Sequence, residues 1–238
     1  MNIDDRERWN AQAKAYPRYE AGDNNYEAGM LKRIIDAGVD FTGKNVLDVG
    51  CGSGMYTIRI AQTAQSVTAL DISDEMLRIL AEDAATAGIK NITPVNSDWE
   101  DFNPSGKYDV IFAAMTPALF NEQGKSKLLA LAKRDNSRIA YMAYSGKQYS
   151  NIWGPLYDRY KIKRDFVNEA DAMCKWLDGQ NTCYTAIPVE GQWVTRHTQS
   201  QMQERVAYNH SKHGISLPDN WLELFLDPQS GLYTEVTD

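Results

Sequence analysis

The sequence predicts an α/β fold in which a doubly wound, mostly parallel sheet carries helices on both faces. Three observations support this prediction. Short apolar runs alternate with segments of helical periodicity between residues 45 and 144. A glycine-rich turn follows the first apolar run directly, and acidic residues stand where later runs end. The length of 238 residues suits one such domain with additions.

Composition is that of an ordinary globular protein, with 43% hydrophobic and 24% charged residues. No apolar run reaches the length of a membrane span, and residues 1–6 lack the basic and apolar blocks of a signal peptide. We therefore expect a cytoplasmic protein without a membrane partner. The net charge of −7, without a long run of Lys or Arg, argues against a nucleic-acid partner.

The three cysteines, Cys51, Cys174 and Cys183, are too few and too scattered for a disulfide framework or a paired-cysteine metal site. The three histidines also lack the paired spacing of metal ligands. The sequence therefore predicts no metal site.

Residues 1–40 are expected to form a helical cap ahead of the sheet. Apolar residues at helical spacing predict helices over residues 6–15 and 26–37. Trp9, Tyr16 and Tyr19 make this region aromatic. Simple packing of the cap onto the core is the favoured explanation for each of these rings, and a binding role is the alternative.

Residues 45–49 predict a buried strand that runs straight into a glycine turn. Gly50, Gly52 and Gly54 let the backbone turn sharply and approach a ligand closely. The following residues, 55–64, contain no Gly or Pro and predict a helix whose first amides point into the turn. A dinucleotide site would need its third glycine where Met55 stands, which argues against an NAD-dependent enzyme.

Residues 66–72 predict the second strand, with Asp71 at its end, 21 positions after Gly50. A strand-helix-strand unit brings two such strand ends side by side, where a carboxylate can accept hydrogen bonds from both hydroxyls of a ribose. A helix-capping role for Asp71 is the alternative. Ser73 weakens it, because this residue already provides a cap for the helix predicted over residues 75–87.

Three further strands are predicted over residues 91–96, 107–115 and 137–144, and a helix over residues 122–134. Asp98 and Trp99 follow the third strand, and Met115 ends the fourth. Ligands of such sheets gather at the carboxyl ends of the strands. Gly50, Asp71, Asp98 and Met115 all fall at these ends, so we expect them to share one site.

The run Asp48-x-Gly50-x-Gly52-x-Gly54 resembles the first cofactor motif of the class I S-adenosylmethionine-dependent methyltransferases, and residues 107–115 resemble the fourth. The resemblance implies that Asp48 lies near the cationic end of the cofactor, that Asp98 meets the adenine amine and that Trp99 lies against the adenine ring. The cofactor-binding residues implied in this way are Asp48, Gly50, Cys51, Gly52, Gly54, Asp71, Ile72, Met76, Asp98, Trp99, Ala113 and Met115.

The resemblance also implies a Rossmann-like sheet of seven strands that ends in an antiparallel hairpin. Beyond residue 145 the sequence predicts helices over residues 151–160, 164–177, 199–211 and 220–226 and strands over residues 182–187, 192–195 and 232–236. We expect residues 1–40 to form a cap or lid and residues 41–238 the methyltransferase domain. Helical additions near the substrate site are expected at residues 146–180 and 198–226, the second interrupting the hairpin.

The reaction that the resemblance implies is in-line transfer of a methyl group to a small molecule. Residues 115–118 (Met-Thr-Pro-Ala) stand where enzymes that methylate nucleic-acid bases carry an Asn/Asp-Pro-Pro-aromatic signature. Tyr16, Tyr19, Tyr144 and His197 are the candidates to face the substrate. The sequence identifies no catalytic base, and alignment of the reacting atoms supplies much of the acceleration in such a reaction.

Two alternative functions remain open at this point. The chain could bind S-adenosylmethionine or S-adenosylhomocysteine without chemistry, or it could methylate a protein or an RNA. The identity of the acceptor and the oligomeric state do not follow from the sequence.

Overall fold

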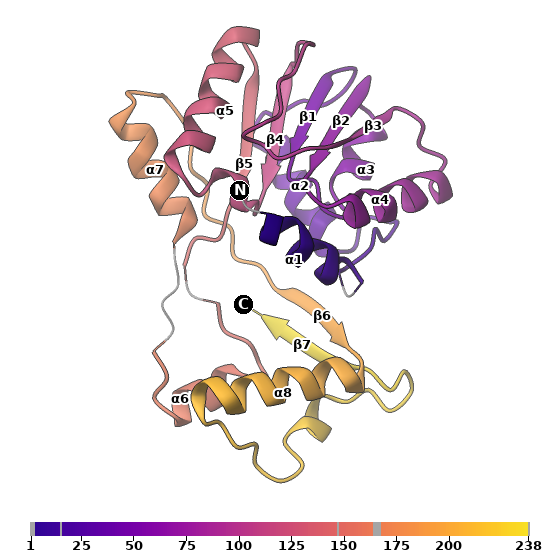
Figure 1. Cartoon of the computed structure of the whole chain (residues 1–238), viewed down its shortest axis with the longest axis vertical. Helices are drawn as coiled ribbons and strands as arrows, with labels where there is room; N and C mark the ends of the chain where they lie inside the picture. The colour runs from indigo at the N-terminus through magenta and orange to yellow at the C-terminus, as the bar shows by residue number, and fades with distance from the viewer. Residues whose placement is uncertain (1–2, 15, 147, 164–167, 238) are drawn as a thin grey trace. The chain divides into compact units, whose positions relative to one another are not determined.

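A computed structural model describes residues 3–14, 16–146, 148–163 and 168–237. The chain divides into two compact parts, Met1–Tyr144 and Ser145–Asp238, which we call the first and second parts (Figure 1). Each part has its own sheet and its own apolar core.

The first part is built on a parallel sheet of five strands in the order β3-β2-β1-β4-β5. The strands are β1 (Asn45–Val49), β2 (Ser66–Asp71), β3 (Ile92–Asn96), β4 (Val110–Ala114) and β5 (Arg138–Met142). The chain adds β2 and β3 on one side of β1 and then returns to add β4 and β5 on the other (Figure 1). The predicted α/β fold with parallel strands is confirmed for this part.

The helices of the first part are α1 (Ile3–Ala13), α2 (Tyr26–Asp36), α3 (Thr57–Ala61), α4 (Asp74–Thr86) and α5 (Glu122–Asp135), with a short 3-10 turn η1 (Pro117–Leu119). Asn25, Ser73 and Asn121 cap α2, α4 and α5, each with a side-chain oxygen that accepts a backbone N–H of the first turn. The helix α3 has five residues. It is shorter than predicted because the glycine turn extends to a Gly54 N–H bond with the Cys51 carbonyl.

Both faces of the parallel sheet are buried. Val46 and Phe112 pack in one cluster with Leu31 of α2 and Ile60 of α3. Neighbouring strand residues point to the opposite face, and Ile111 is 0% exposed there as well. A central strand covered on both sides explains the continuous apolar runs of the sequence.

The second part contains α6 (Gly154–Arg159), α7 (Glu169–Gly179), β6 (Trp193–His197), α8 (Gln199–His213), a 3-10 turn η2 (Leu222–Phe225) and β7 (Tyr233–Thr237). β6 and β7 form an antiparallel pair, and α8, which follows β6 directly, runs beside it (Figure 1). Thr198 and Gln201 form a capping box at the start of α8. The helical insertion predicted between the last two strands is therefore present.

Several predictions for the second part need correction. The single sheet of seven strands is not found in the described residues, because β6 and β7 pair with each other in a separate sheet and with none of the strands β1 to β5. Residues 182–187 form no strand, since their side chains are mostly exposed and no strand pairs with them. The helix predicted over residues 220–226 is reduced to η2, and residues 164–167 of another predicted helix lie outside the described residues.

Every helix in the described ranges is too short or too polar to span a bilayer.

Candidate active site

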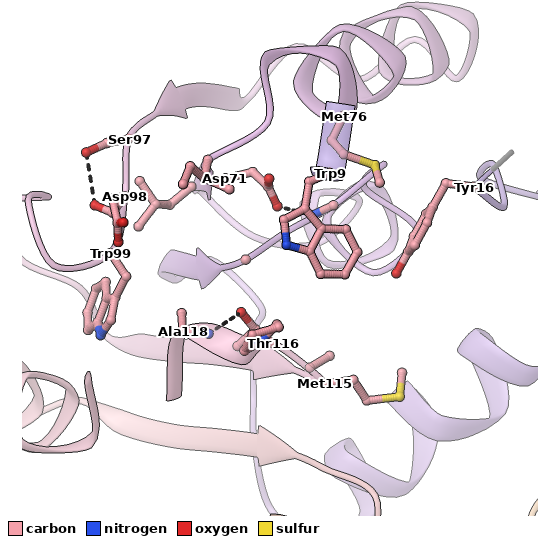
Figure 2. Close-up of a pocket in the computed structure, with 16 residues that line it drawn as sticks. Trp9, Tyr16, Asp71, Met76, Ser97, Asp98, Trp99, Met115, Thr116 and Ala118 are labelled. Atoms are coloured by element: carbon pink, nitrogen blue, oxygen red, sulfur yellow. Dashed lines mark hydrogen bonds between the residues drawn. The ribbon is translucent and has the colours of Figure 1, made fainter. Parts of the chain in front are cut away.

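A cleft opens at the carboxyl ends of the parallel strands in the first part (Figure 2). It lies at β1 and β4, where the order of the strands in the sheet reverses. It encloses about 620 Å³ that no atom fills, including space open to solvent. The residues that line it are Trp9, Tyr16, Gly50, Gly52, Leu70, Asp71, Ile72, Met76, Ser97, Asp98, Trp99, Ala114, Met115, Thr116, Pro117 and Ala118. The predicted meeting of Gly50, Asp71, Asp98 and Met115 is therefore observed.

Gly50 begins the turn that forms the floor of the cleft. Its φ of +71° is a left-handed conformation that favours glycine. The N–H groups of Gly50 and Cys51 both donate to the Leu70 carbonyl, at 2.8 and 3.0 Å, which ties β1 to the end of β2. A Cβ atom on Gly50 would stand 2.1 Å from the hydroxyl oxygen of Thr116. Thr116, at the exit of β4, thus occupies the space that a side chain on Gly50 would need.

The rest of the glycine turn is held from two sides. The Gly52 N–H donates to Asp71 Oδ2 at 2.8 Å, and a Cβ on Gly54 would stand 2.6 Å from Leu80 Cγ of α4. Gly54 and Cys51 do not line the cleft. Gly54 therefore allows the turn to pack closely against α4. The Cys51 side chain is enclosed by protein, and this burial raises the pKa of its thiol.

Asp71 faces the cleft from the end of β2 (Figure 2). Its Oδ2 accepts the Gly52 N–H, and its Oδ1 accepts the Ser73 N–H at 2.9 Å. The capping of α4 belongs to Ser73, whose hydroxyl oxygen accepts the Met76 N–H at 3.1 Å. Burial raises the pKa of Asp71, while the hydrogen bonds from backbone N–H groups oppose that shift. Each carboxylate oxygen keeps a further lone pair for a ligand hydroxyl.

Asp48 does not line the cleft, although the sequence predicts it as a cofactor-binding residue. It is 2% exposed, and its Oδ2 accepts a hydrogen bond from the Thr57 hydroxyl at 2.6 Å. Burial raises the pKa of Asp48 to about 7, and the charge of Asp71 adds to the shift. The Asp48 carboxyl group is therefore enclosed by protein beside the glycine turn.

Asp98 and Trp99 form one wall of the cleft. Asp98 Oδ1 accepts the Glu100 N–H at 3.0 Å, which fixes the loop after β3. The Trp99 indole N–H donates to the Gly124 carbonyl at 3.0 Å, and the Lys127 ammonium lies 4.9 Å from the ring centroid. Trp99 is only 3% exposed. Trp99 lines the cleft with only a small part of its surface. The open ring face predicted to lie against adenine is not seen.

The exit of β4 forms the opposite side of the cleft. Met115 has a φ of +49°, a costly conformation for a residue with a side chain, and its N–H donates to the Met142 carbonyl at 2.7 Å. Ala113 is fully buried and does not line the cleft, whereas Ala114 does. Thr116 was predicted only as part of the strand exit, and its own role is to cap η1 by accepting the Ala118 N–H at 3.3 Å. The signal was present, because a threonine followed by proline is typical of a turn that starts a helix.

The helix α1 and the residues just after it bring two aromatic side chains to the cleft. Trp9 and Tyr16 both line it, with ring centroids 6.4 Å apart in an edge-to-face arrangement (Figure 2). Asn10 fixes α1 to the start of α4, since its amide donates to Asp74 at 2.8 Å and its oxygen accepts the Ser73 hydroxyl at 2.6 Å. An aromatic cover over the cleft is therefore part of the observed fold.

The segment between α1 and α2 is anchored to the glycine turn and to α3. The Ser53 hydroxyl, within the glycine turn, donates to the Pro17 carbonyl at 2.6 Å. Arg59 of α3 donates to the carbonyls of Glu20 and Gly22. Tyr19 lies over the Arg59 guanidinium, with the Cζ atom 5.2 Å from its ring centroid, and does not line the cleft.

Comparison with known proteins identifies the class. Residues 46–134 match the family model described as a methyltransferase domain. Residues 46–134 therefore form a methyltransferase domain. This stretch contains β1 to β4, most of α5 and every lining residue of the cleft except Trp9 and Tyr16.

Curated relatives of this methyltransferase domain have different acceptors in their names. Nocamycin O-methyltransferase of Saccharothrix syringae is 31% identical over 43% of this chain and 38% of its own length. Magnesium-protoporphyrin O-methyltransferase of Rhodobacter capsulatus is 30% identical over 50% and 52%. Ribosomal RNA small subunit methyltransferase G of Alteromonas mediterranea is 33% identical over 35% and 42%. The chain thus spans about half or less of the length of these relatives.

A solved structure of an S-adenosylmethionine-dependent methyltransferase from Aquifex aeolicus gives a TM-score of 0.46, with 19% identity over 83% of this chain and 92% of that chain. This is a distant likeness.

Of the four predicted substrate-facing residues, only Tyr16 lines the cleft; Tyr144 and His197, like Tyr19, do not. Tyr144 is half-buried after β5 and does not line the cleft of the methyltransferase domain. Burial and the neighbouring Tyr16 and Tyr26 raise the pKa of Tyr144. His197 belongs to β6 of the second part, where its Nε2 lies 2.9 Å from Glu235 Oε2. Within the described residues, no group of three or more His, Cys, Asp or Glu side chains is placed to hold a metal ion.

The burial of Asp48 leads to a prediction about stability and pH. Asp48→Asn keeps an oxygen that can accept the Thr57 hydroxyl and removes the charge, so the variant should be more stable than the parent at pH 8 by on the order of 3 kcal/mol. Because the folded-state pKa is raised from 3.8 to about 7, the parent loses stability as the pH rises between these values.

Urea denaturation of both proteins between pH 4 and pH 8 measures the effect of this substitution. The gap should grow up to about pH 7 and stay constant above it. Asp109→Asn, at an exposed position before β4, is the matched control and should show no such trend. A gap that shrinks with rising pH would contradict a raised pKa at Asp48.

Proposed function

We propose that the protein transfers a methyl group from S-adenosylmethionine to a small-molecule acceptor. The observation that carries this proposal is the carboxylate of Asp71, which faces the cleft while it also accepts the N–H of Gly52 in the glycine turn. A ribose at this position would find a double hydrogen-bond acceptor beside a backbone without a side chain.

The cleft residues fit this cofactor. Gly52 leaves room beside the backbone, Asp71 suits the ribose, and Asp98 suits the adenine amine beside the wall that Trp99 forms. When bound, the cofactor supplies a methyl group on a positively charged sulfur. The charged side chains among the lining residues, Asp71 and Asp98, are both acidic, which favours a cation and disfavours the phosphates of a dinucleotide.

A small acceptor suits the cover on the cleft. Trp9 and Tyr16 narrow the opening, and their segment is anchored at Ser53 and Arg59. Such an enclosure excludes water and orients a small molecule, and the net charge of −7 is unfavourable for approach to RNA. We propose that residues 1–40 act as a lid of this kind and that residues 41–238 complete the domain.

An RNA acceptor is the second candidate, because one relative is named as a ribosomal RNA methyltransferase. Incubation of the full chain with donor labelled in the methyl group, and with cell extract split into small-molecule, protein and RNA fractions, decides between the candidates. Label in a small molecule other than the donor, seen after chromatographic separation and absent without the protein, supports the proposal. Label confined to the RNA or protein fraction overturns it, and binding of the cofactor without any transfer would favour a binding module.

The role proposed for Asp71 gives a separate prediction. Asp71→Ala removes two charge-assisted hydrogen bonds to a ribose, so the Kd for S-adenosylhomocysteine should rise by roughly 10- to 150-fold. Calorimetric titration measures it, and a melting curve checks that the variant folds. Asp40→Ala, an exposed aspartate ahead of β1, should bind like the parent. An unchanged Kd in folded Asp71→Ala would leave Asp71 as a support of the glycine turn only.

A further inference from the structure

The start of α5 is bound to the segment that follows β3, residues 97–102, which we call the β3 loop. This loop brings Asp98 and Trp99 to one wall of the cleft (Figure 2). The helix residues that make the contact follow one another at intervals of three, so they are neighbours on the helix surface. We call them the α5 clamp: Asn121, Gly124 and Lys127.

Lys127 donates to three carbonyl oxygens of the β3 loop. Its Nζ lies 2.5 Å from the Trp99 oxygen and 2.9 Å from the Glu100 oxygen, and it also binds the Phe102 oxygen. The same ammonium lies 4.9 Å from the centroid of the Trp99 ring. An ammonium group has three N–H donors, and these three carbonyls use all of them. Lys127 therefore acts on the loop and keeps no donor for a ligand.

Asp98 is linked to Lys127 through the residues that follow it. The carbonyl of Glu100 accepts from Lys127, and the N–H of Glu100 donates to Asp98 Oδ1 at 3.0 Å. The N–H of Phe102 donates to the Asp98 carbonyl at 2.9 Å, and the Phe102 carbonyl binds Lys127 as well. The ammonium of Lys127 thus closes the backbone turn that orients the Asp98 carboxylate.

The other two residues of the α5 clamp support the same loop. The carbonyl of Gly124 accepts the Trp99 indole N–H at 3.0 Å. The Asn121 amide donates to Glu100 Oε1 at 3.1 Å, while its oxygen caps the helix by accepting the Gly124 N–H at 2.7 Å. A Cβ on Gly124 would stand 2.0 Å from the Ala118 carbonyl oxygen. The start of α5 therefore touches both the β3 loop and the segment that follows β4, which line the cleft together.

Charge gives the β3 loop a second reason to need a cation. The loop carries three carboxylates within four residues, Asp98, Glu100 and Asp101. Like charges at this spacing repel one another. Lys127 brings one positive charge to this run while it binds the carbonyl oxygens. A neutral side chain at position 127 would leave both the repulsion and the carbonyls without their partner.

We propose that Lys127 is a positioning residue that makes the cleft selective for adenine over a purine with oxygen in place of the amine. The inference rests on the proposed function, in which Asp98 meets the adenine amine. By fixing the β3 loop, Lys127 holds the Asp98 carboxylate where this amine can donate to it. A base with a carbonyl oxygen at the same place turns a lone pair toward the carboxylate and is rejected.

Two ligands that differ only in the base test this role. They are S-adenosylhomocysteine and S-inosylhomocysteine, in which an oxygen replaces the amine. In calorimetric titration the parent should bind the adenine compound at least about tenfold more tightly. Lys127→Met keeps a side chain of similar length without the ammonium, so this ratio should fall to about threefold or less. A merely structural role would weaken the binding of both ligands alike and leave the ratio unchanged.

Three further variants sharpen the comparison. Lys133→Met, at an exposed position of the same helix, is the matched control and should keep the ratio of the parent. Lys127→Arg retains several donors and should keep more of the preference than Lys127→Met. Asn121→Ser retains an oxygen for the cap and loses the amide that binds Glu100. It should lower the ratio by a smaller factor, and it decides the question if Lys127→Met does not fold.

Hydrogen exchange measures the positioning without any cofactor. The amides of Glu100 and Phe102, which donate to Asp98, should exchange at least about tenfold faster in Lys127→Met than in the parent. The amides of β1 and β4 should exchange as they do in the parent.

An unchanged ratio in folded Lys127→Met, unchanged exchange in the β3 loop, or equal binding of the two ligands by the parent would each overturn the inference. Failure of the parent to bind S-adenosylhomocysteine would instead overturn the proposed function itself.

Discussion

Gly50→Ala is expected to abolish cofactor binding and to lower the free energy of unfolding by about 2–5 kcal/mol. The new Cβ would stand 2.1 Å from Thr116 Oγ1 and 2.7 Å from Thr116 Cβ, and the φ of +71° adds backbone strain. Either the turn or the exit of β4 must shift, and both are walls of the cleft. Urea denaturation and titration with S-adenosylhomocysteine measure the two effects.

Gly88 offers a control with the same backbone conformation. Its φ is also +71°, but a Cβ there would meet nothing within 4 Å. Gly88→Ala should therefore show the backbone strain alone, about 1–2 kcal/mol, and should leave cofactor binding intact. The double variant with Thr116→Gly should recover part of what Gly50→Ala loses. Equal costs for Gly50→Ala and Gly88→Ala would mean that the contact with Thr116 is not restrictive.

Glu235→Ala is expected to destabilise the second part by about 2–4 kcal/mol. Glu235 on β7 is 5% exposed and accepts the Ser150 hydroxyl at 2.6 Å, while its other oxygen lies 2.9 Å from His197 and 2.8 Å from Arg205. Removal of this carboxylate leaves three partners without their acceptor. The effect falls short of that for a fully enclosed ion pair, because the Arg205 side chain is 42% exposed. Thermal unfolding followed by circular dichroism measures the loss.

The pH dependence of the Glu235 effect follows from its pKa. Burial alone would raise the pKa of Glu235, but hydrogen bonds from His197 and Ser150 and the charge of Arg205 hold it below its usual value of 4.5. A carboxyl group with a lowered folded-state pKa stabilises the fold above its unfolded-state pKa and loses this effect as the pH falls. The difference between parent and Glu235→Ala should therefore be full at pH 6 and shrink below about pH 4.5. Glu223→Ala, in the exposed turn η2, should show no such difference.

Local signals in the sequence were enough to predict the parallel sheet. The central strands β1 and β4 are short apolar runs with a clear break after each, and caps such as Ser73 and Asn121 mark where helices begin. The strand register places the ends of neighbouring strands side by side, since Val49 at the end of β1 pairs with Leu70 near the end of β2. This is why the side chains at the strand ends could be predicted to meet.

A local sequence pattern does not show which side chains the neighbouring elements will enclose. The residues whose roles were predicted wrongly share this cause. Asp48 stands inside the first motif, yet its side chain is enclosed with Thr57. Trp99 follows the third strand as predicted, but its indole N–H donates a hydrogen bond to the Gly124 carbonyl of α5, and the ring is buried there. Residues 182–187 have the composition of a strand, but a strand also needs a partner to pair with.

The cleft is complete at Ala118, and the match to the methyltransferase family ends at residue 134, before the second part begins. Within the first part, the contact of Gly50 with Thr116 limits what either position accepts, because a larger side chain at one must be matched by a smaller one at the other.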